Sequence, residues 1–353
     1  MQITMLNPHE LKRYNRHIIL PEIGMEGQQK LKLAKVLVIG AGGLGCPLLQ
    51  YLAAAGVGTI GVVDSDRVDE SNLHRQILYS SNDVGKNKAD IAAKKLAELN
   101  PFINIIPIAS YLNSENALQL FSDYDIIIDG SDNFATRYLV NDACVILNKP
   151  FVSGSIYKFQ GQISVFNYND GPTYRCLYPE PGETPNCAEV GVLGVLPGIV
   201  GCLMANETIK MIIGNGELLS GKLLVFDSLT MQFNTFGFST VAENKNIKTL
   251  SNYDFFCESE MKEITADELK MKRQSGEKFQ LIDVREPHEY EQKNIGGLLI
   301  PSGELEKNLD KISITLPVII HCQSGMRSKK AIELLKQKGF KNLVNLKNGL
   351  KDF

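Results

Sequence analysis

Residues 35–45 read Lys-Val-Leu-Val-Ile-Gly-Ala-Gly-Gly-Leu-Gly, an apolar run that passes directly into a glycine-rich turn. The run Lys35–Ile39 predicts a buried strand. A helical pattern follows over residues 46–55, and Thr59–Val63 predicts a second apolar strand. Strand, glycine turn, helix and strand form the βαβ unit of a parallel sheet. This stretch therefore predicts an α/β fold.

The same alternation of helices and apolar strands continues as far as Pro150. Further strands are predicted over residues 103–108 and 125–128, with helices between them. Beyond Pro150 apolar and polar residues alternate, as over 162–166, which is typical of antiparallel strands. We predict a Rossmann-like, mostly parallel sheet with an antiparallel extension.

A polar stretch around residues 239–252 interrupts this pattern. A second, smaller α/β unit follows, in which Thr265 and Glu268 form the sequence signature of a helix start. Strands are predicted near residues 279–282 and 318–320. The predicted division is a first domain over residues 1–245, a linker over 246–261 and a second domain over 262–353.

The composition limits the class of protein. The 353 residues are 44% hydrophobic and 22% charged, and the formal net charge is −3. These values fit a folded protein of about two domains and provide no positive field for nucleic acid. Residues 1–16 lack the apolar core of a signal peptide, and the apolar stretch 190–205 contains Pro197 and is shorter than the roughly 20 residues of a span. Seven cysteines do not form a disulfide framework, so we expect a cytoplasmic protein without a membrane partner.

The glycine turn has the spacing of a phosphate-binding loop. Gly40, Gly42 and Gly45 stand between strand and helix, and Asp64 ends the next strand. Such glycines let the backbone approach a phosphate, and an acid at the second strand can bind ribose hydroxyls. Taken alone, the pattern indicates a nicotinamide-dependent oxidoreductase.

The polar residues that follow neighbouring strands change this interpretation. Residues 64–76 read Asp-Ser-Asp-Arg-Val-Asp-Glu-Ser-Asn-Leu-His-Arg-Gln, Lys88 opens a later helix, and Asp132 and Asn133 follow the strand 125–128. The carboxyl ends of parallel strands meet at one edge of the sheet, so these groups converge. A triphosphate needs cations against its charge and a carboxylate that holds magnesium. The cluster favours ATP.

These residues resemble the ThiF/MoeB/HesA family, the bacterial relatives of ubiquitin-activating enzymes. The resemblance covers about the first two thirds of the chain. The matching strings are Arg13-Tyr-Asn-Arg16, Gly40 to Gly45, Asp64-x-Asp66, Ser71-Asn-Leu-x-Arg-Gln76, Lys88, Asp132-Asn133, Val152-Ser-Gly-Ser and Gly161-Gln162. The resemblance implies ATP-dependent adenylylation of the C-terminal glycine of a ubiquitin-fold sulfur carrier, by a homodimer.

Roles follow for the nucleotide residues. We assign Arg75 and Lys88 to the phosphates, Asp64 to ribose and Asp132 to magnesium. By resemblance, Arg16 reaches the phosphates bound to the neighbouring subunit; otherwise it is a solvated helix residue. The predicted nucleotide-binding set is Gly40, Gly42, Gly43, Gly45, Asp64, Asp66, Ser71, Asn72, Leu73, Arg75, Lys88, Asp132 and Asn133. Asp66 as a turn residue and Asn72 as a cap are the plainer alternatives.

Two predictions about cysteines depend on the resemblance to the family. Cys187 lies in a polar loop, where relatives have a thiol that takes the activated carboxyl or relays sulfur; the alternative is a partly buried loop cysteine. Many relatives bind structural zinc with two Cys-x-x-Cys pairs. Here each pair has lost one sulfur, leaving Cys176 and Cys257 with Asp254 as an uncertain third ligand. Because structural zinc has four ligands, we predict no zinc.

The second domain contains a thiol loop, His321-Cys-Gln-Ser-Gly-Met-Arg-Ser328, between a strand and a helix. Backbone N–H groups at such a turn stabilise a thiolate, as in cysteine phosphatases and persulfide-forming sulfurtransferases. Phosphatases have Cys-x5-Arg, whereas Cys322 and Arg327 are one residue closer, which suits a persulfide. The loop residues are Gln323, Ser324, Gly325, Met326 and Arg327.

The rest of this domain resembles the rhodanese family from about residue 261 onward. Matching strings are Asp283-Val-Arg-Glu-Pro-His-Glu-Tyr290, Asn294-Ile-Gly-Gly297 and Asn348-Gly-Leu350. Asn294 replaces the usual histidine. We expect Asp283 and Arg285 to be structural, with Arg285 paired to Glu286 or Glu289.

Together the two domains predict one pathway. The chain adenylylates a carrier of the molybdopterin synthase small-subunit or ThiS type, which ends in Gly-Gly. A Cys322 persulfide, loaded by a donor such as a cysteine desulfurase, then attacks the acyl-adenylate, and Cys187 or another thiol releases the thiocarboxylate. Molybdopterin synthesis, thiamine synthesis and tRNA thiolation all fit. The alternatives are a nicotinamide oxidoreductase and an adenylating enzyme whose rhodanese-like domain only docks partners.

Overall fold

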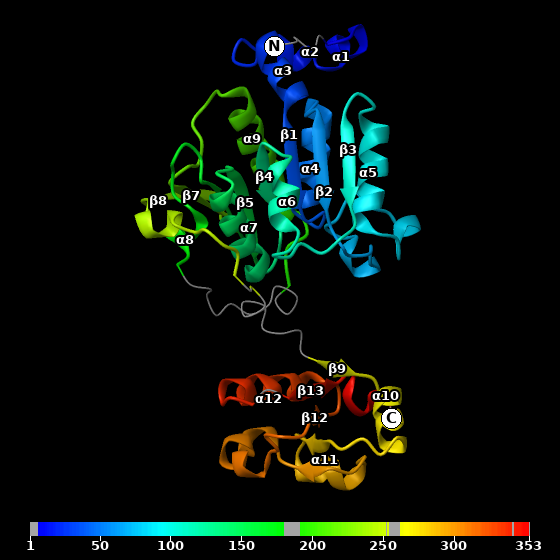
Figure 1. Ribbon diagram of the computed structural model, residues 1–353. Helices are drawn as coiled ribbons and strands as arrows, with labels where there is room; N and C mark the ends of the chain where they lie inside the picture. The colour runs from blue at the N-terminus through cyan, green and yellow to red at the C-terminus, as the bar shows by residue number, and fades with distance from the viewer. Residues whose placement is uncertain (1–5, 180–190, 252, 254–261, 341, 353) are drawn as a thin grey trace. The chain divides into compact units, whose positions relative to one another are not determined.

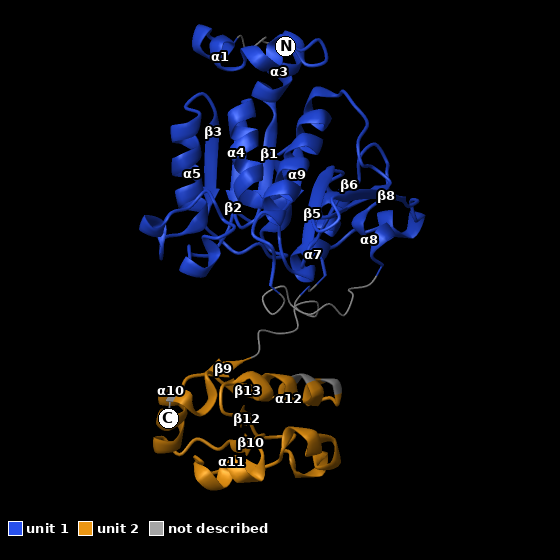
Figure 2. Cartoon of the chain, turned by 180° about the vertical axis from the view of Figure 1, so that it is seen from behind, with its two compact units in different colours: residues 1–257 blue, residues 258–353 orange. Residues whose placement is uncertain are grey.

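The computed structural model describes residues 6–179, 191–251, 253, 262–340 and 342–352. The chain divides into two compact units, residues 1–257 and residues 258–353, coloured separately in Figure 2. Each unit has its own sheet and its own apolar cores.

Unit 1 is built on an eight-stranded sheet, in the order β3-β2-β1-β4-β5-β6-β7-β8 (Figure 1). The first five strands are parallel, and β6, β7 and β8 extend the sheet in antiparallel fashion. The strands are β1 Lys35–Ile39, β2 Thr59–Val63, β3 Asn104–Ile108, β4 Ile126–Asp129, β5 Phe151–Tyr157, β6 Gln160–Phe166, β7 Lys222–Asp227 and β8 Gln232–Gly237. The predicted mostly parallel sheet with an antiparallel extension is confirmed.

Helices cover both faces of this sheet. Alternate residues of β1 enter different cores, Val36 and Val38 on one face and Leu37 and Ile39 on the other. This explains the unbroken apolar run, because a parallel strand covered on both faces has no polar side. The helices are α4 Gly45–Ala55, α5 Lys88–Leu99 and α9 Leu196–Ile213 on the first face, and α6 Ala117–Ser122 and α7 Phe134–Ile146 on the second.

Shorter elements complete unit 1. Tyr253, from the stretch predicted as a linker, packs in the second core and donates a 2.7 Å hydrogen bond to Asp142. The remaining elements are α1 Pro8–Arg13, α2 Asn15–Ile18, α3 Gly24–Leu33, α8 Tyr174–Leu177 and the 3-10 turns η1 Glu70–Asn72, η2 Ser81–Asp83 and η3 Ala242–Lys245.

Helix α9 corrects one expectation. Pro197 does not interrupt an apolar segment but stands in the first turn of α9, where its missing N–H costs nothing. The helix has 18 residues and is long and apolar enough to cross a membrane by length and composition alone. Half of it is buried inside unit 1, where Val200 and Met204 join the core beside α4 and β5. The apolar composition of α9 is therefore explained by its packing in the core of unit 1.

Unit 2 has a five-stranded parallel sheet in the order β11-β10-β12-β13-β9. Thr265 caps α10 through the predicted capping box with Glu268. The elements are β9 Glu263–Ile264, α10 Ala266–Gln274, β10 Gln280–Asp283, α11 Pro287–Gln292, β11 Leu298–Leu299, η4 Ser302–Lys307, η5 Leu309–Lys311, β12 Val318–His321, α12 Met326–Gln337, β13 Leu343–Leu346 and η6 Gly349–Asp352. The predicted smaller α/β unit is confirmed.

Candidate active sites

The glycine turn between β1 and α4 is dictated by steric constraints. Gly40 has φ +89°, a conformation that favours glycine. A Cβ on Gly45 would lie 2.0 Å from the carbonyl oxygen of Gly40, so no other residue fits. Gly42 and Gly43 stay half-buried, which leaves their backbone within reach of a ligand at the N-terminus of α4. The turn has the geometry of an anion site.

Asp64 ties the end of β2 to this turn. Its carboxylate accepts hydrogen bonds of 2.8 Å from the backbone N–H groups of Ala41 and Asp66. Burial raises the pKa of Asp64, and the nearby charge of Lys88 opposes that shift. The carboxylate is therefore held in place beside the glycine turn, as its predicted contact with ribose requires.

Lys88, the first residue of α5, is one of two predicted phosphate ligands. Its side chain is only 6% exposed, yet its Nζ lies 2.9 Å from Oδ2 of Asp66, whose side chain is 69% exposed. The ammonium group thus reaches the surface of the site from a buried stem. This ammonium group is paired with Asp66.

The segment after β2 brings Arg75 to the glycine turn. Asp69 begins η1 by accepting the N–H of Ser71, and Arg75 donates to the carbonyl oxygen of Ser71 at 3.3 Å. The Cγ of Arg75 is 3.6 Å from the position that a Cβ on Gly43 would take. Among the other predicted ligands, Asn72 and Leu73 are half-buried in the same segment. As predicted, the segment that follows β2 lies close to the glycine turn.

Gln76 is a site residue that the sequence reasoning did not assign, although it ends the matching string. It is 4% exposed, and its Nε2 lies 3.6 Å from the Cβ position of Gly42. Its Oε1 is buried without a hydrogen-bond partner among the described residues. A buried amide beside a phosphate-binding turn fits a group that is completed by ligand.

The loop after β4 lies on the other side of the turn. A Cβ on Gly40 would come within 3.1 Å of the carbonyl oxygen of Gly130. Asp132 is exposed, whereas Asn133 caps α7 by accepting the N–H of Thr136 at 2.8 Å. Asn133 thus has a structural role besides any contact with a nucleotide.

Arg16 is not brought to this site by its own chain. Figure 1 shows α1, α2 and α3 at the edge of the sheet where β1 begins, opposite to the carboxyl ends of the parallel strands. Tyr14, next to α2, packs on Gly56 at the C-terminal end of α4, while the glycine turn is at its N-terminal end. The 11 residues of α4 span about 16 Å, which separates Tyr14 from the glycine turn. Arg16 is exposed on α2, on the wrong side for its own nucleotide.

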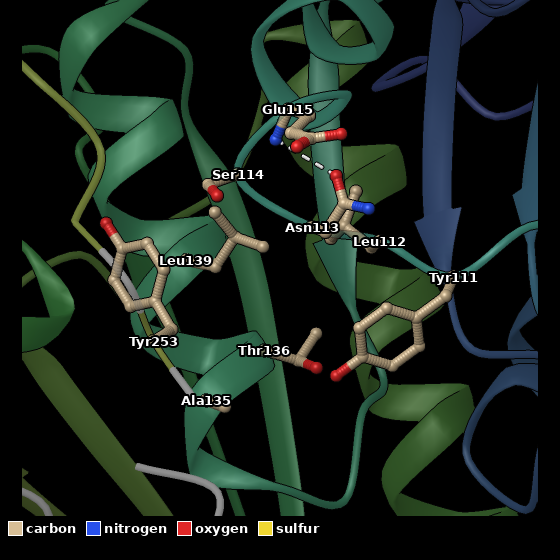
Figure 3. Close-up of a pocket in the computed structure, with 9 residues that line it drawn as sticks. All are labelled: Tyr111, Leu112, Asn113, Ser114, Glu115, Ala135, Thr136, Leu139 and Tyr253. Carbon is tan, nitrogen blue, oxygen red and sulfur yellow. Dashed lines mark hydrogen bonds between the residues drawn. The ribbon is translucent and has the colours of Figure 1, made fainter. Parts of the chain in front are cut away.

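A pocket of about 350 Å³ adjoins the edge formed by the carboxyl ends of the parallel strands (Figure 3). It lies between the loop after β3 and the first turns of α7, with Tyr111 and Tyr253 on opposite sides. Its lining residues are Tyr111, Leu112, Asn113, Ser114, Glu115, Ala135, Thr136, Leu139 and Tyr253. The loop starts beside Asp64, whose N–H donates to Ile108 at 3.2 Å.

In unit 2 the thiol of Cys322 lies in a cradle of donors. Ser328 Oγ is 3.6 Å from Sγ, and the backbone N–H groups of Ser328, Ser324 and Arg327 also point to the sulfur. Burial by itself would raise the pKa of the Cys322 thiol, but these donors lower it below its ordinary value. The predicted thiolate nest is present at the N-terminus of α12.

Close packing shapes this loop. Gly325 has φ +86° and precedes α12. Beneath it, a Cβ on Gly349 would lie 2.2 Å from the carbonyl oxygen of Cys322, and Leu350 donates its N–H to that oxygen at 3.0 Å. The Asn348-Gly-Leu350 string therefore supports the thiol loop from below.

The charged residues around the loop are paired differently from the prediction. Arg285 binds the buried carboxylate of Asp283 at 2.7 Å instead of Glu286 or Glu289. Glu289 pairs with Arg327. Arg285 also donates to the side chain of Gln323 at 3.3 Å and so joins the ion pair to the thiol loop.

Three of the four residues in the remaining cysteine and zinc predictions lie outside the described ranges. Cys187, Asp254 and Cys257 all fall there. The thiol of Cys176 accepts the N–H of Val241 at 3.3 Å and that of Thr173 at 3.4 Å. In the described part of the chain no group of three or more His, Cys, Asp or Glu residues could hold a metal ion.

Comparisons with known proteins match each unit to a family model and nearly the whole chain to a named relative. The ThiF family model matches residues 14–249, and the rhodanese-like domain matches residues 265–353. The chain is 46% identical to the probable adenylyltransferase/sulfurtransferase MoeZ of Mycobacterium tuberculosis, over 98% of this chain and 93% of that protein. It is 51% identical to the sulfur carrier protein adenylyltransferase of Thermus thermophilus, over 70% of this chain and 97% of that protein. The structure of E. coli MccB with ATP aligns with a TM-score of 0.60 at 25% identity, over 67% of this chain and 73% of MccB.

Proposed function

The chain belongs to the ThiF family and carries a rhodanese-like domain, and from this premise we propose how its two sites act in turn on one sulfur carrier protein. It is an adenylyltransferase and a sulfurtransferase, as are relatives named over nearly its whole length. The carrier has a ubiquitin fold, ends in Gly-Gly and is of the molybdopterin synthase small-subunit or ThiS type. The reaction takes place in the cytoplasm.

The first step needs no general base. A C-terminal carboxylate has a pKa near 3.3–3.7 and is ionised at neutral pH. One of its oxygens attacks the α-phosphorus of ATP, the bond to the bridging oxygen breaks, and pyrophosphate leaves with the electron pair. The protein therefore supplies position and charge. Arg75 beside the glycine turn and Lys88 bind the phosphates, and Asp64 binds the ribose.

The nucleotide lies along the edge of unit 1 at the carboxyl ends of the parallel strands. From ribose at Asp64, the loop that begins after Ile108 leads to the pocket of Figure 3. Its volume of about 350 Å³ and its mixture of apolar and polar walls suit the adenine base. The amino group of Lys88 exchanges the exposed carboxylate of Asp66 for a phosphate oxygen when ATP binds.

Magnesium fits Asp132. This metal is usually held by one or two carboxylates together with the substrate phosphates, so a single protein ligand suffices. Asp132 is exposed after β4 and makes no hydrogen bond or ion pair with the described residues. When bound, magnesium supplies charge neutralisation to the phosphates.

Arg16 completes the site from a second copy of the chain. Because it lies at the far edge of its own sheet, it serves a partner subunit in a homodimer. There the guanidinium binds the phosphates as an arginine finger does, and stabilises charge on the departing pyrophosphate. The plainer role as a solvated helix residue leaves it without effect on adenylylation.

The second step transfers sulfur. A donor such as a cysteine desulfurase converts Cys322 to a persulfide. The terminal sulfur attacks the carrier acyl carbon, AMP leaves, and an acyl disulfide links carrier and Cys322. A thiol, Cys187 or an external one, then attacks Sγ of Cys322, and the carrier leaves as a thiocarboxylate. The resulting disulfide is reduced by a further thiol pair before the next cycle.

The observation that carries this proposal is that one chain holds a phosphate-binding turn with Arg75 beside it and a thiolate cradle at Cys322. The test is a mass spectrum of purified carrier after incubation with the chain, ATP, magnesium and a sulfur donor. We expect one oxygen replaced by sulfur. Carrier adenylate alone supports a docking role for unit 2, and no change together with tight NAD binding supports the oxidoreductase.

A further inference from the structure

Arg75, which we assign to the phosphates, is held at one end of its guanidinium by its own segment. Its Nη1 lies 2.6 Å from Nε2 of His74 and donates a longer hydrogen bond of 3.3 Å to the carbonyl oxygen of Ser71. Because a guanidinium can only donate, the imidazole nitrogen accepts in the shorter bond. His74 fills the position that the Ser71-Asn-Leu-x-Arg-Gln76 string leaves open. It has no role in the nucleotide set described above.

The other edge of the same guanidinium is left for a ligand. Nε and Nη2 of Arg75 make no hydrogen bond or ion pair with the residues that the structure describes. Two adjacent N–H groups on one edge of a guanidinium match two oxygens of a phosphate. The stem of Arg75 passes the glycine turn, where its Cγ is 3.6 Å from the Cβ position of Gly43. Fixing Nη1 therefore also fixes the direction of the free edge.

A more distant segment of unit 1 packs against His74. A Cβ on Gly194 would lie 2.6 Å from the carbonyl oxygen of His74 and 3.0 Å from its Nδ1. Residues 191–195 therefore contact both the backbone and the ring of His74, and only a glycine permits this approach. The same segment leads into α9, where Pro197 comes within 3.2 Å of the Cβ position of Gly43. The ring of His74 is thus held between this segment and Arg75.

The choice of an imidazole as the partner has a consequence for charge. Lys88, the second cation assigned to the phosphates, is paired with the carboxylate of Asp66. The imidazole that accepts from Arg75 is neutral, so the guanidinium keeps its whole charge for the nucleotide. Binding of a ligand by a free arginine also costs the entropy of ordering its long side chain. The contact with His74 orders the guanidinium before ATP arrives.

We propose that His74 is a positioning residue of the adenylylation site, which holds Nη1 of Arg75 and so presents Nε and Nη2 to the phosphates of ATP. Gly194 supports this role, because it lets its segment pack against the imidazole. The inference rests on the proposed function, since it requires Arg75 to bind phosphate.

Substitutions at position 74 test which ring nitrogen matters. His74→Gln places an amide oxygen near the position of Nε2 and should retain the affinity for ATP. The shorter amide of His74→Asn reaches only the position of Nδ1, away from Arg75. For His74→Asn, we expect the Kd of the full chain for ATP with magnesium, measured by calorimetry without carrier, to rise about five- to tenfold. In carrier-dependent pyrophosphate exchange, KM for ATP should rise with kcat unchanged within about twofold, because ground state and transition state lose the same contact.

Two further measurements separate positioning from damage to the fold. Adenosine has no phosphates, so its inhibition constant against pyrophosphate exchange should be the same in His74→Asn as in the unchanged chain. In a chain that already carries Arg75→Ala, His74→Asn should have no further effect on the Kd for ATP. Both results are expected only if residue 74 acts through Arg75.

Gly194→Ala approaches His74 from the other side. A methyl group there requires His74 to shift, so the Kd for ATP should again rise, and combination with His74→Asn should add little. Gly191→Ala is the matched control. It lies in the same segment, no atom lies within 4 Å of its Cβ position, and it should leave the Kd unchanged.

Three results overturn the proposal. ATP affinity that is unchanged in His74→Asn shows that Arg75 needs no partner. An equal loss in His74→Gln and His74→Asn shows that the acceptor at Nε2 is not what matters. A parallel loss of adenosine binding shows that residue 74 only supports the fold. If the unchanged chain binds no ATP, the proposed function fails, which is a different result from equal affinities among the variants.

Discussion

The nucleotide edge of unit 1 is assembled from distant segments, whereas the thiol loop of unit 2 is formed almost entirely by consecutive residues. Gly43, Arg75 and Asp132 come from three connections, and the polar groups among them are partly exposed or unpartnered. Around Cys322 the backbone N–H groups of Ser324, Arg327 and Ser328 already point to the sulfur. In the proposed function the first site is completed by substrate and by a second subunit, whereas the donors of the second are already in place. Adenylylation should therefore depend on assembly, and sulfur loading should not.

The largest effect is expected from Cys322→Ser. Serine fits the buried cradle but forms no persulfide, so thiocarboxylate formation should fall by about a thousandfold or more. Pyrophosphate–ATP exchange with the carrier should be retained, because that step uses unit 1 alone. Both are measured on the same preparation. Thiocarboxylate formed at the native rate would mean that unit 2 only docks partners.

Asp132→Ala should affect the nucleotide site of unit 1. Loss of the carboxylate that we assign to magnesium should reduce carrier-dependent pyrophosphate exchange by about 10²–10³-fold. Loading of Cys322 from a sulfur donor should be unchanged, which separates the two units. Asp123→Ala, another exposed carboxylate of unit 1, is the matched control. Exchange that survives Asp132→Ala at the native rate refutes the magnesium assignment.

A smaller loss, about 10–100-fold in exchange, is expected from Arg16→Ala, because other cations remain at the phosphates. Mixing Arg16→Ala with Asp132→Ala tests where Arg16 acts. A mixed dimer has one site with an intact Asp132 from one chain and an intact Arg16 from the other. After random exchange of subunits, activity should recover to about a quarter of the native value.

Recovery of activity in the mixed dimers tests directly whether the nucleotide site of unit 1 needs Arg16 from a second subunit. Two inactive variants that stay inactive after mixing, although dimers of both chains form, would place Arg16 outside the site. Arg13→Ala, at an exposed arginine that ends the preceding helix α1, provides the matched control.

The difference between the two regions also explains what the sequence could predict. Gly40, Gly45 and Cys322 were identified because their roles depend on neighbours in the chain: a steric limit in one turn and a thiol before a helix. The parallel sheet followed from apolar runs that are covered on both faces. Such local constraints leave a clear pattern of residues.

Contacts between distant segments left no such pattern. Arg327 and Glu289 are 38 positions apart, and Glu289 could equally have paired with Arg285. The burial of Gln76 depends on how its segment folds onto Gly42. Pro197 was read as an interruption because its place in the first turn of α9 depends on where that helix begins. Tertiary packing decides each of these.

The smallest effect on the reaction, but a measurable one on stability, is expected from His321. Its ring is fully buried beside Cys322, 3.9 Å from the carboxylate of Asp283, and neither ring nitrogen has a hydrogen-bond partner among the described residues. Burial lowers the pKa of His321 to about 4, with Arg285 adding to the shift and Asp283 opposing it. The folded protein therefore holds this side chain neutral.

The sign of the pH dependence follows. Between about pH 6.5 and 4 the unfolded chain binds a proton at His321 that the folded chain does not. The free energy of unfolding of unit 2 should therefore fall by about 3 kcal/mol as pH drops through this window. Hydrogen exchange of the β12 amides measures it. His321→Phe should flatten the curve, while His288→Gln, at an exposed site, should not. The carboxylate of Glu289 loses its contribution only below the ordinary carboxyl pKa, so a slope that persists above pH 5 in His321→Phe would contradict the assignment.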